Sequence, residues 1–170
     1  MIFTKTDIEG VVLVELERNE DARGSFSRAF CENEFGESGF PFHVSQANLS
    51  RSCGKGTIRG MHYQQAGIHE CKIVRCVRGA VWDVVVDMRQ DSPTALHHLS
   101  FELNEVNGLA LCIPDGVAHG HQALTDEACA RNRERIHGLE KAVLLVARDC
   151  RGQPDRGDHE NRGENEGEDL

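Results

Sequence analysis

The chain has 170 residues, of which 39% are hydrophobic, and a formal net charge of −9 at pH 7. This length suits one domain with or without a tail. The excess of 28 acidic over 19 basic residues argues against general nucleic-acid binding, and no apolar run approaches the roughly 20 residues of a transmembrane helix.

Short β-branched and apolar segments dominate the first 130 residues and predict strands. In chain order they are residues 11–16, 43–50, 71–78, 80–88, 97–103 and 109–113. Within the fourth segment, Trp82 and Val84 fall on one face, whereas Asp83 and Val85 fall on the other. The dipeptide Asn107-Gly108 predicts a tight hairpin between the last two strands. Many short strands joined by turns are typical of an antiparallel sandwich, jelly roll or barrel.

The chain changes character near residue 130. Beyond it, Ile136, Leu139, Val143 and Val146 follow helical spacing, which predicts a helix within residues 131–148. Residues 149–170 contain a single aliphatic side chain, that of the terminal leucine, and so we expect a disordered tail. The predicted organisation is a β-domain over residues 1–130, a helix over 131–148 and a tail over 149–170.

The seven cysteines suggest neither a zinc ribbon nor a disulfide framework. Their number is odd, and no pair has the spacing Cys-x-x-Cys. We therefore expect free thiols that pack as small apolar residues, in a protein of the reducing cytoplasm.

Polar side chains inside the predicted strands carry the chemical signal. They are Arg59, His62, Lys72, Arg75, His119 and His121. Taken singly, each is typical of a solvated face or of a histidine with an ordinary structural role. Taken together on a concave sheet face, they would form a polar pocket inside a barrel.

Five segments give the chain a family resemblance over roughly residues 1–128. They are DARGSF (21–26), QANLS (46–50), GTIRGMHYQ (56–64), CKIVRCVRGAVWDVVVDMRQDSPT (71–94) and IPDGVAHGHQAL (113–124). In order and spacing they resemble the dTDP-4-dehydrorhamnose 3,5-epimerase family. That family consists of cupin-like jelly rolls that invert C3 and C5 of a nucleotide-linked 4-keto-6-deoxyhexose. The resemblance implies an all-β, cupin-like jelly roll and an isomerase of deoxysugar biosynthesis.

The resemblance also implies site residues and partners. His62 would be the base that removes a proton beside the ketone, and Lys72 would donate to the developing O4 oxyanion. The substrate-binding residues would be Arg23, Arg28, Gln46, Ala47, Asn48, Arg59 and His119. Arg23 would reach the nucleotide from the partner subunit of a homodimer. We expect no metal and no organic cofactor, and neither a nucleic acid nor a membrane as partner.

Three departures from the family pattern leave part of this reaction unassigned. The family usually has glutamate at the position of Arg28, so recognition of the nucleotide base is in question. Asn132 stands where the family has its general-acid tyrosine. Nothing after Ala130 matches the segment that supplies the aspartate behind the base histidine, and neither Asp149 nor Asp169 has that context.

Other functions remain open at this stage. Pro114, Gly116 and His119 match the second metal motif of cupins, and His62, Glu70 and His119 could form a site of two histidines and a carboxylate. Without the acid tyrosine, the chain could instead be a sugar-nucleotide-binding remnant. Epimerisation at C3 alone or ketoisomerisation would use the same pocket.

Overall fold

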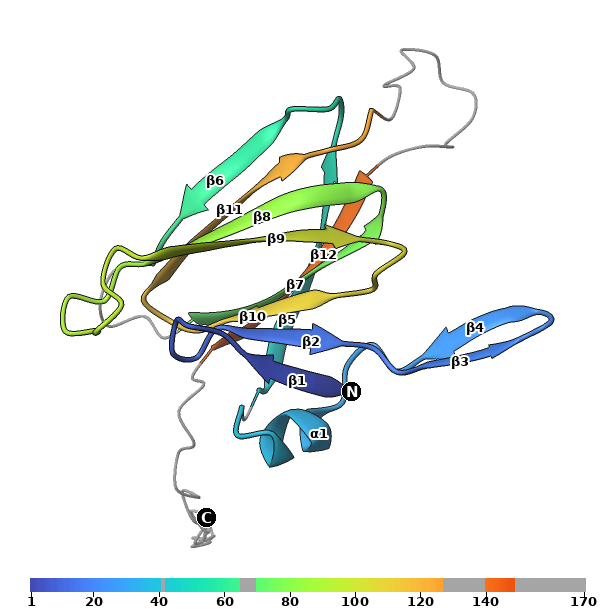
Figure 1. The fold of residues 1–170 in the computed structure, drawn as a ribbon, viewed down its shortest axis with the longest axis horizontal. Coiled ribbons are helices and arrows are strands. Elements are labelled where there is room, and N and C mark those ends of the chain that lie inside the picture. Colours follow the sequence, from blue (N-terminus) through green and yellow to red (C-terminus); the bar gives the residue numbers. More distant parts are fainter. Residues whose placement is uncertain (41, 65–69, 127–139, 149–170) are drawn as a thin grey trace, which may run out of the picture.

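A computed structural model of the chain describes residues 1–40, 42–64, 70–126 and 140–148 (Figure 1). Its elements are β1 (Ile2–Lys5), β2 (Val12–Glu15), β3 (Arg18–Asp21), β4 (Gly24–Ser27), α1 (Glu32–Glu37), β5 (Val44–Ser52), β6 (Ile58–His62), β7 (Glu70–Arg78), β8 (Ala80–Asp87), β9 (His98–Asn104), β10 (Ala110–Ile113), β11 (Val117–Ala123) and β12 (Glu140–Arg148). The six strand segments predicted from the sequence correspond to β2, β5, β7, β8, β9 and β10.

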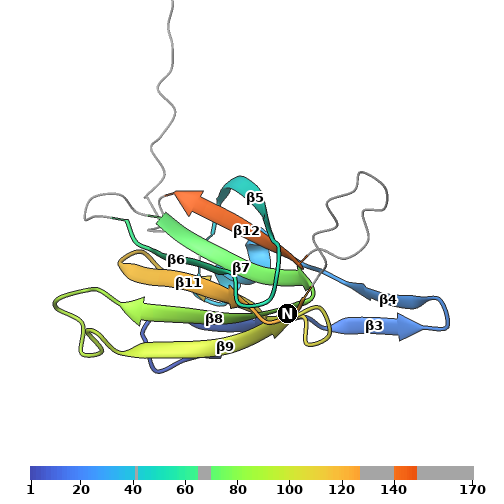
Figure 2. The same cartoon turned by 90° about the horizontal axis from the view of Figure 1, so that it is seen from above.

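The strands form two facing antiparallel sheets, which confirms the all-β prediction. One sheet has the order β1-β2-β10-β7-β12-β5, and the other has the order β6-β11-β8-β9. Seen from above, they lie as two layers, and the two-stranded ribbon β3–β4 extends beyond them (Figure 2).

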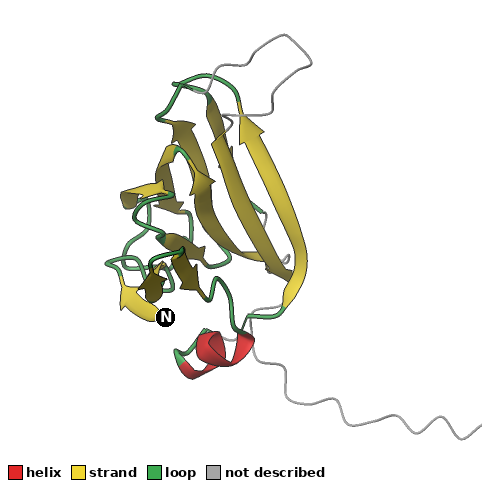
Figure 3. Ribbon diagram, turned by 90° about the vertical axis from the view of Figure 1, so that its right-hand side faces the viewer, coloured by secondary structure: helices red, strands yellow, loops and turns green. Residues whose placement is uncertain are grey.

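Two apolar clusters bury the six-stranded sheet on both faces. Val74 and Cys76 of β7 contribute to the cluster between the sheets, together with Val85 of β8. Ile73, on the opposite face of β7, belongs to a second cluster, which includes Phe35. Phe35 belongs to α1, a short helix that the sequence analysis did not anticipate and that lies at one end of the strands (Figure 3). Strand β7 is therefore central: β10 and β12 pair with it on either side, and residues on both of its faces are buried.

The helix predicted within residues 131–148 is wrong for the part that the structure describes. Residues 140–148 form β12, which pairs with β7 on one side and β5 on the other. A continuous apolar run that includes valines suits a central strand as well as a helix, and pairing with two neighbours decides for the strand. The β-domain thus extends beyond residue 130. Residues 131–139 and the predicted tail over 149–170 lie outside the described part.

Two smaller predictions are also corrected. A turn forms at Asn107-Gly108, but it joins the two sheets instead of closing a hairpin, because β9 pairs with β8 whereas β10 pairs with β2 and β7. All four residues of β10 are buried, so this strand belongs in the middle of its sheet. Cys71 is disulfide-bonded, contrary to the expectation of free thiols throughout.

Candidate active site

The polar residues of β6 and β11 meet on one strand pair. In this antiparallel ladder His119 lies opposite His62, and His121 lies opposite Arg59, with a bulge between the two positions. Directly opposite residues of an antiparallel pair have Cβ atoms about 4.5–5.5 Å apart. The structure therefore brings together three residues predicted from the sequence, His62, Arg59 and His119.

Two glycines allow β6 and β11 to approach closely at the bulge. A Cβ added to Gly60 would lie 2.6 Å from the Cα of Gly120 and 2.9 Å from the carbonyl oxygen of His119. A Cβ on Gly120 would lie 2.8 Å from the Sδ of Met61. Any larger residue would force the strands apart, so the glycines beside His62 and His119 position those histidines.

A buried carboxylate holds the ring of His119. Asp83 Oδ2 lies 2.8 Å from His119 Nε2, and both side chains are buried. On β8, Asp83 shares a face with Val85, which belongs to the cluster between the sheets. The alternation of β8 predicts that Asp83 shares this face with Val85, but it predicts no role for the carboxylate. The available signal was an acidic residue that alternates with apolar residues on the buried face of a strand.

Lys72 faces the same interior from the opposite sheet. It lies on the same face of β7 as Val74 and Cys76, both of which pack between the sheets. Its Nζ lies 3.2 Å from Glu70 Oε1, and Gln64 Nε2 donates to the other carboxylate oxygen at 2.8 Å. Lys72 is thus a buried ammonium group held by one carboxylate.

Arg59 connects β6 to β5, the strand that carries three more of the predicted binding residues. Arg59 Nε donates to Ser52 Oγ at 3.0 Å and Nη2 donates to the carbonyl oxygen of Arg51 at 2.7 Å, which ties the two strands together. Three further predicted binding residues lie in the exposed stretch of β5, at the edge of the larger sheet: Gln46, Ala47 and Asn48.

Two predicted binding residues do not join this group within one chain. Arg23 lies in the turn of the β3–β4 ribbon, which projects from the body (Figure 1), and it pairs with Asp21 at 2.6 Å. Arg28 pairs with Glu34 of α1 at 2.6 Å.

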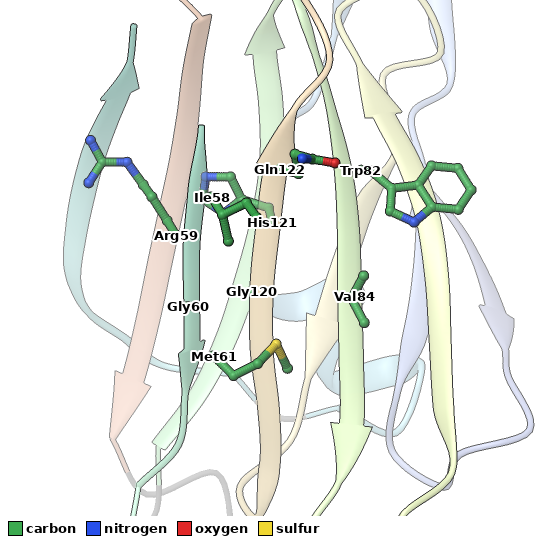
Figure 4. Close-up of a pocket in the computed structure, with 9 residues that line it drawn as sticks. All are labelled: Ile58, Arg59, Gly60, Met61, Trp82, Val84, Gly120, His121 and Gln122. Carbon is green, nitrogen blue, oxygen red and sulfur yellow. The ribbon is translucent and has the colours of Figure 1, made fainter. Parts of the chain in front are cut away.

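A separate pocket of about 260 Å³ lies along β6, β11 and β8 (Figure 4). Its apolar lining includes Met61, Trp82 and Val84. Trp82 and Val84 alternate with Asp83 along β8, so this pocket opens largely on the face opposite the Asp83–His119 pair. His121 also contributes to the lining, and burial lowers the pKa of its imidazole, with a smaller effect from the neighbouring His119.

The metal-ligand set considered from the sequence differs from the one that the structure groups. Glu70 is held by Lys72 and Gln64. Among the described residues, the histidines and carboxylates that could hold one ion are Asp83, His119 and His121.

The comparisons with known proteins agree with this architecture. The family model for dTDP-4-dehydrorhamnose 3,5-epimerase matches residues 5–133. A dTDP-4-dehydrorhamnose 3,5-epimerase of Sinorhizobium fredii is 40% identical over 124 residues, which are 73% of this chain and 64% of that protein. The chain thus spans less than two thirds of this relative.

Two solved structures share the fold. The epimerase from Bacillus anthracis with TDP and PPi bound has a TM-score of 0.77 at 27% identity, covering 89% of this chain and 79% of the other. The Legionella pneumophila enzyme in complex with dTDP-4-keto-L-rhamnose has a TM-score of 0.74 at 29% identity, with coverage of 87% and 72%.

The two facing antiparallel sheets and the similarity to these solved structures define a cupin-like jelly roll. The chain belongs to the dTDP-4-dehydrorhamnose 3,5-epimerase family. In the described part of the chain, no helix is long and apolar enough to span a membrane.

Proposed function

We propose that the chain is an epimerase that inverts C3, C5 or both in a dTDP-4-keto-6-deoxyhexose. The observation that carries the proposal is the cross-strand pair of His62 and His119, with Asp83 behind His119 and Lys72 on the facing sheet. The ligands named for the two solved relatives, TDP and dTDP-4-keto-L-rhamnose, support this substrate class.

The residue types suit proton transfer beside a ketone. A proton on C3 or C5 is weakly acidic, and its removal needs a positioned base and a stabilised enolate. His62 is the base in this proposal, and the ammonium group of Lys72 donates to the developing O4 oxyanion. Because both carbons flank the same ketone, one base and one oxyanion donor serve both centres. No step of this proton transfer requires a metal or an organic cofactor.

Arginine and amide groups would hold the rest of the substrate. Arg59 and His119 lie on the His62 ladder and would contact the sugar and diphosphate, since a guanidinium can engage two phosphate oxygens. Gln46, Ala47 and Asn48 would line the open edge beside them. Arg28, now paired with Glu34, would lie near the nucleotide base.

A homodimer would bring Arg23 to this site. All residues of β3 and all but one of β4 are exposed, and Phe26 is 74% exposed. A two-stranded ribbon is marginally stable in water on its own, which favours a partner surface beneath it. The ribbon of one protomer would then supply Arg23 to the His62 pocket of the other.

The decisive experiment is proton NMR of a 4-keto-6-deoxy sugar nucleotide in heavy water. The wild-type chain should exchange the C3 proton with deuterium faster than it inverts the configuration at C3. The family's acid position is occupied by Asn132, outside the described residues, and an amide does not act as an acid near neutral pH. Loss of a general acid slows reprotonation from the opposite face by about 10²–10⁴-fold.

Variants separate the roles within this experiment. His62→Asn should abolish exchange, and Lys72→Ala should slow both exchange and inversion. The control is His43→Asn, since His43 is exposed and contacts Glu32 of α1. Proton exchange that persists in His62→Asn would refute the assignment of His62 as the base. If the wild-type chain binds dTDP but does not exchange the substrate proton, the proposal that it is an enzyme is refuted, and the chain is a sugar-nucleotide-binding remnant. Inversion as fast as exchange would show that another group donates the proton, with His121 and Cys129 tested first.

A further inference from the structure

Three side chains with metal-binding chemistry converge from two paired strands. In the β8–β11 ladder Asp83 lies directly opposite His121, and His119 lies diagonally from it, opposite Val85. Residues two apart in a strand share a face, so both imidazoles and the carboxylate are on the same side. One ligand atom from each of the three residues lies within 4.8 Å of those of the other two.

Two polar atoms of this cluster are buried without a partner. Asp83 Oδ1 and His121 Nδ1 make no hydrogen bond among the described residues, although both atoms are inaccessible to solvent. Asp83 is fully buried, and only its other oxygen is used, by His119. A buried polar atom without a hydrogen-bond partner is unfavourable, and more so when the group is charged. Each of these two atoms is therefore available to a polar group or an ion at this cluster.

We propose that Asp83, His119 and His121 bind a divalent late first-row metal ion, such as zinc, cobalt or nickel. Two imidazole nitrogens and one carboxylate oxygen are the donor set that these ions favour. Bonds of about 2.0–2.2 Å place ligand atoms of one tetrahedral ion roughly 3.3 Å apart. The cluster therefore needs only side-chain adjustments to close around an ion, with a fourth position left for water.

The ion would influence the neighbouring chemistry without taking part in it. His119 faces His62 across the β6–β11 ladder. An ion on His119 would withdraw that imidazole from a substrate, so metal binding and substrate binding would compete. This consequence rests on the proposed function, whereas the metal site itself does not.

Cobalt(II) provides a test that needs no substrate. Untagged protein freed of metal by a chelator is titrated with Co²⁺, and its visible d–d absorption is followed. The wild-type chain should bind one ion, and the complex should show strongly shifted imidazole proton resonances from two histidines. His121→Gln should weaken binding at least tenfold, since even the loss of an outer-shell partner weakens metal affinity by about 10–100-fold. His98→Gln, on the exposed part of β9, is the matched control and should bind as the wild type does.

Each outcome decides the inference. Equal Co²⁺ affinity in His121→Gln and wild type would overturn it, since the ion would then be bound elsewhere, for example by an exposed thiol. Absence of shifted imidazole resonances in the wild-type complex would overturn it without reliance on any variant. If Co²⁺ binds as expected but no proton exchange occurs, the proposed function fails and the metal site stands. If proton exchange occurs and Co²⁺ does not bind, the metal site fails and the proposed function stands.

Discussion

Replacing Asp87 by asparagine should unfold the protein at markedly lower denaturant concentration. Asp87 ends β8, is fully buried and organises the loop that leads to β9. Its carboxylate accepts hydrogen bonds from Arg89 Nε at 2.8 Å, Arg89 Nη2 at 2.9 Å, Ser92 Oγ at 2.6 Å and Thr94 Oγ1 at 2.7 Å. Arg89 also donates to the carbonyl oxygen of Glu9, which connects this loop to the turn before β2.

The expected loss follows from these contacts. An asparagine side chain would keep one acceptor oxygen. In place of the other oxygen it would direct an amide N–H₂ group at the hydrogen-bond donors that this oxygen now accepts from. A hydrogen bond to a charged group contributes about 1.5–3 kcal/mol, but bonds to one carboxylate are not additive. Arg89 is partly exposed and can regain water, and the hydroxyls of Ser92 and Thr94 can rotate. We therefore expect the free energy of unfolding to fall by about 2–4 kcal/mol.

The assay is urea unfolding of Asp87→Asn beside Asp91→Asn, a control that changes an exposed carboxylate of the same loop. The pH dependence provides a second arm. The Arg89 guanidinium, followed by the hydroxyls, holds the pKa of Asp87 well below its ordinary value of 3.8. A carboxylate with a lowered folded-state pKa stabilises the protein above its unfolded pKa, and that stability is lost as the pH falls. The difference between wild type and Asp87→Asn should thus be constant near neutral pH and shrink below about pH 4.

Two results would refute this reasoning. One is a free energy of unfolding for Asp87→Asn that is the same as for Asp91→Asn. The other is a stability difference that stays unchanged on acidification, which would show that the charge of Asp87 contributes nothing.

Two further predictions concern the approach of β6 to β11 and the dimer. Gly60→Ala should reduce stability by more than about 2 kcal/mol, because the new Cβ would meet Gly120 at 2.6 Å and φ is +120°. Gly36→Ala, in α1 with open space around it, should be neutral or stabilising by up to about 1 kcal/mol, and equal melting temperatures for the two variants would contradict the steric argument. Mixing Arg23→Ala with His62→Ala should restore proton exchange through hybrid dimers. Hybrids that form but remain inactive would exclude a shared site.

The sequence predicted the strands better than it predicted their partners. Alternation and β-branched residues identify β7 and β8, since these are local properties of the chain. The pairing of β12 between β7 and β5 depends on residues that lie far apart in the chain, and an apolar run alone does not reveal it. Likewise Asn107-Gly108 predicts a turn, but whether that turn closes a hairpin depends on the burial of β10.

The same distinction applies to the site. The segments containing His62, Lys72 and His119 were recognisable by resemblance, and the structure places His62 opposite His119. The role of Asp83 required knowledge of which face of β8 points inward, because the alternation places Trp82 and Val84 on one face and Asp83 on the other without showing which face is buried.

Burial divides the candidate site into a fixed half and an open half, and this division has a chemical consequence. Asp83 and His119 are buried, and their hydrogen bond fixes the imidazole before any ligand arrives. All residues of β6, including His62, are exposed, and β5 beside it is exposed over most of its length. In the uncovered protein the imidazole of His62 is therefore solvated. A bound sugar nucleotide or a partner ribbon over β5 and β6 would exclude that water. Coverage of this edge would strengthen the interaction of His62 and Lys72 with charge on the substrate, since electrostatic interactions grow as the surroundings become less polar.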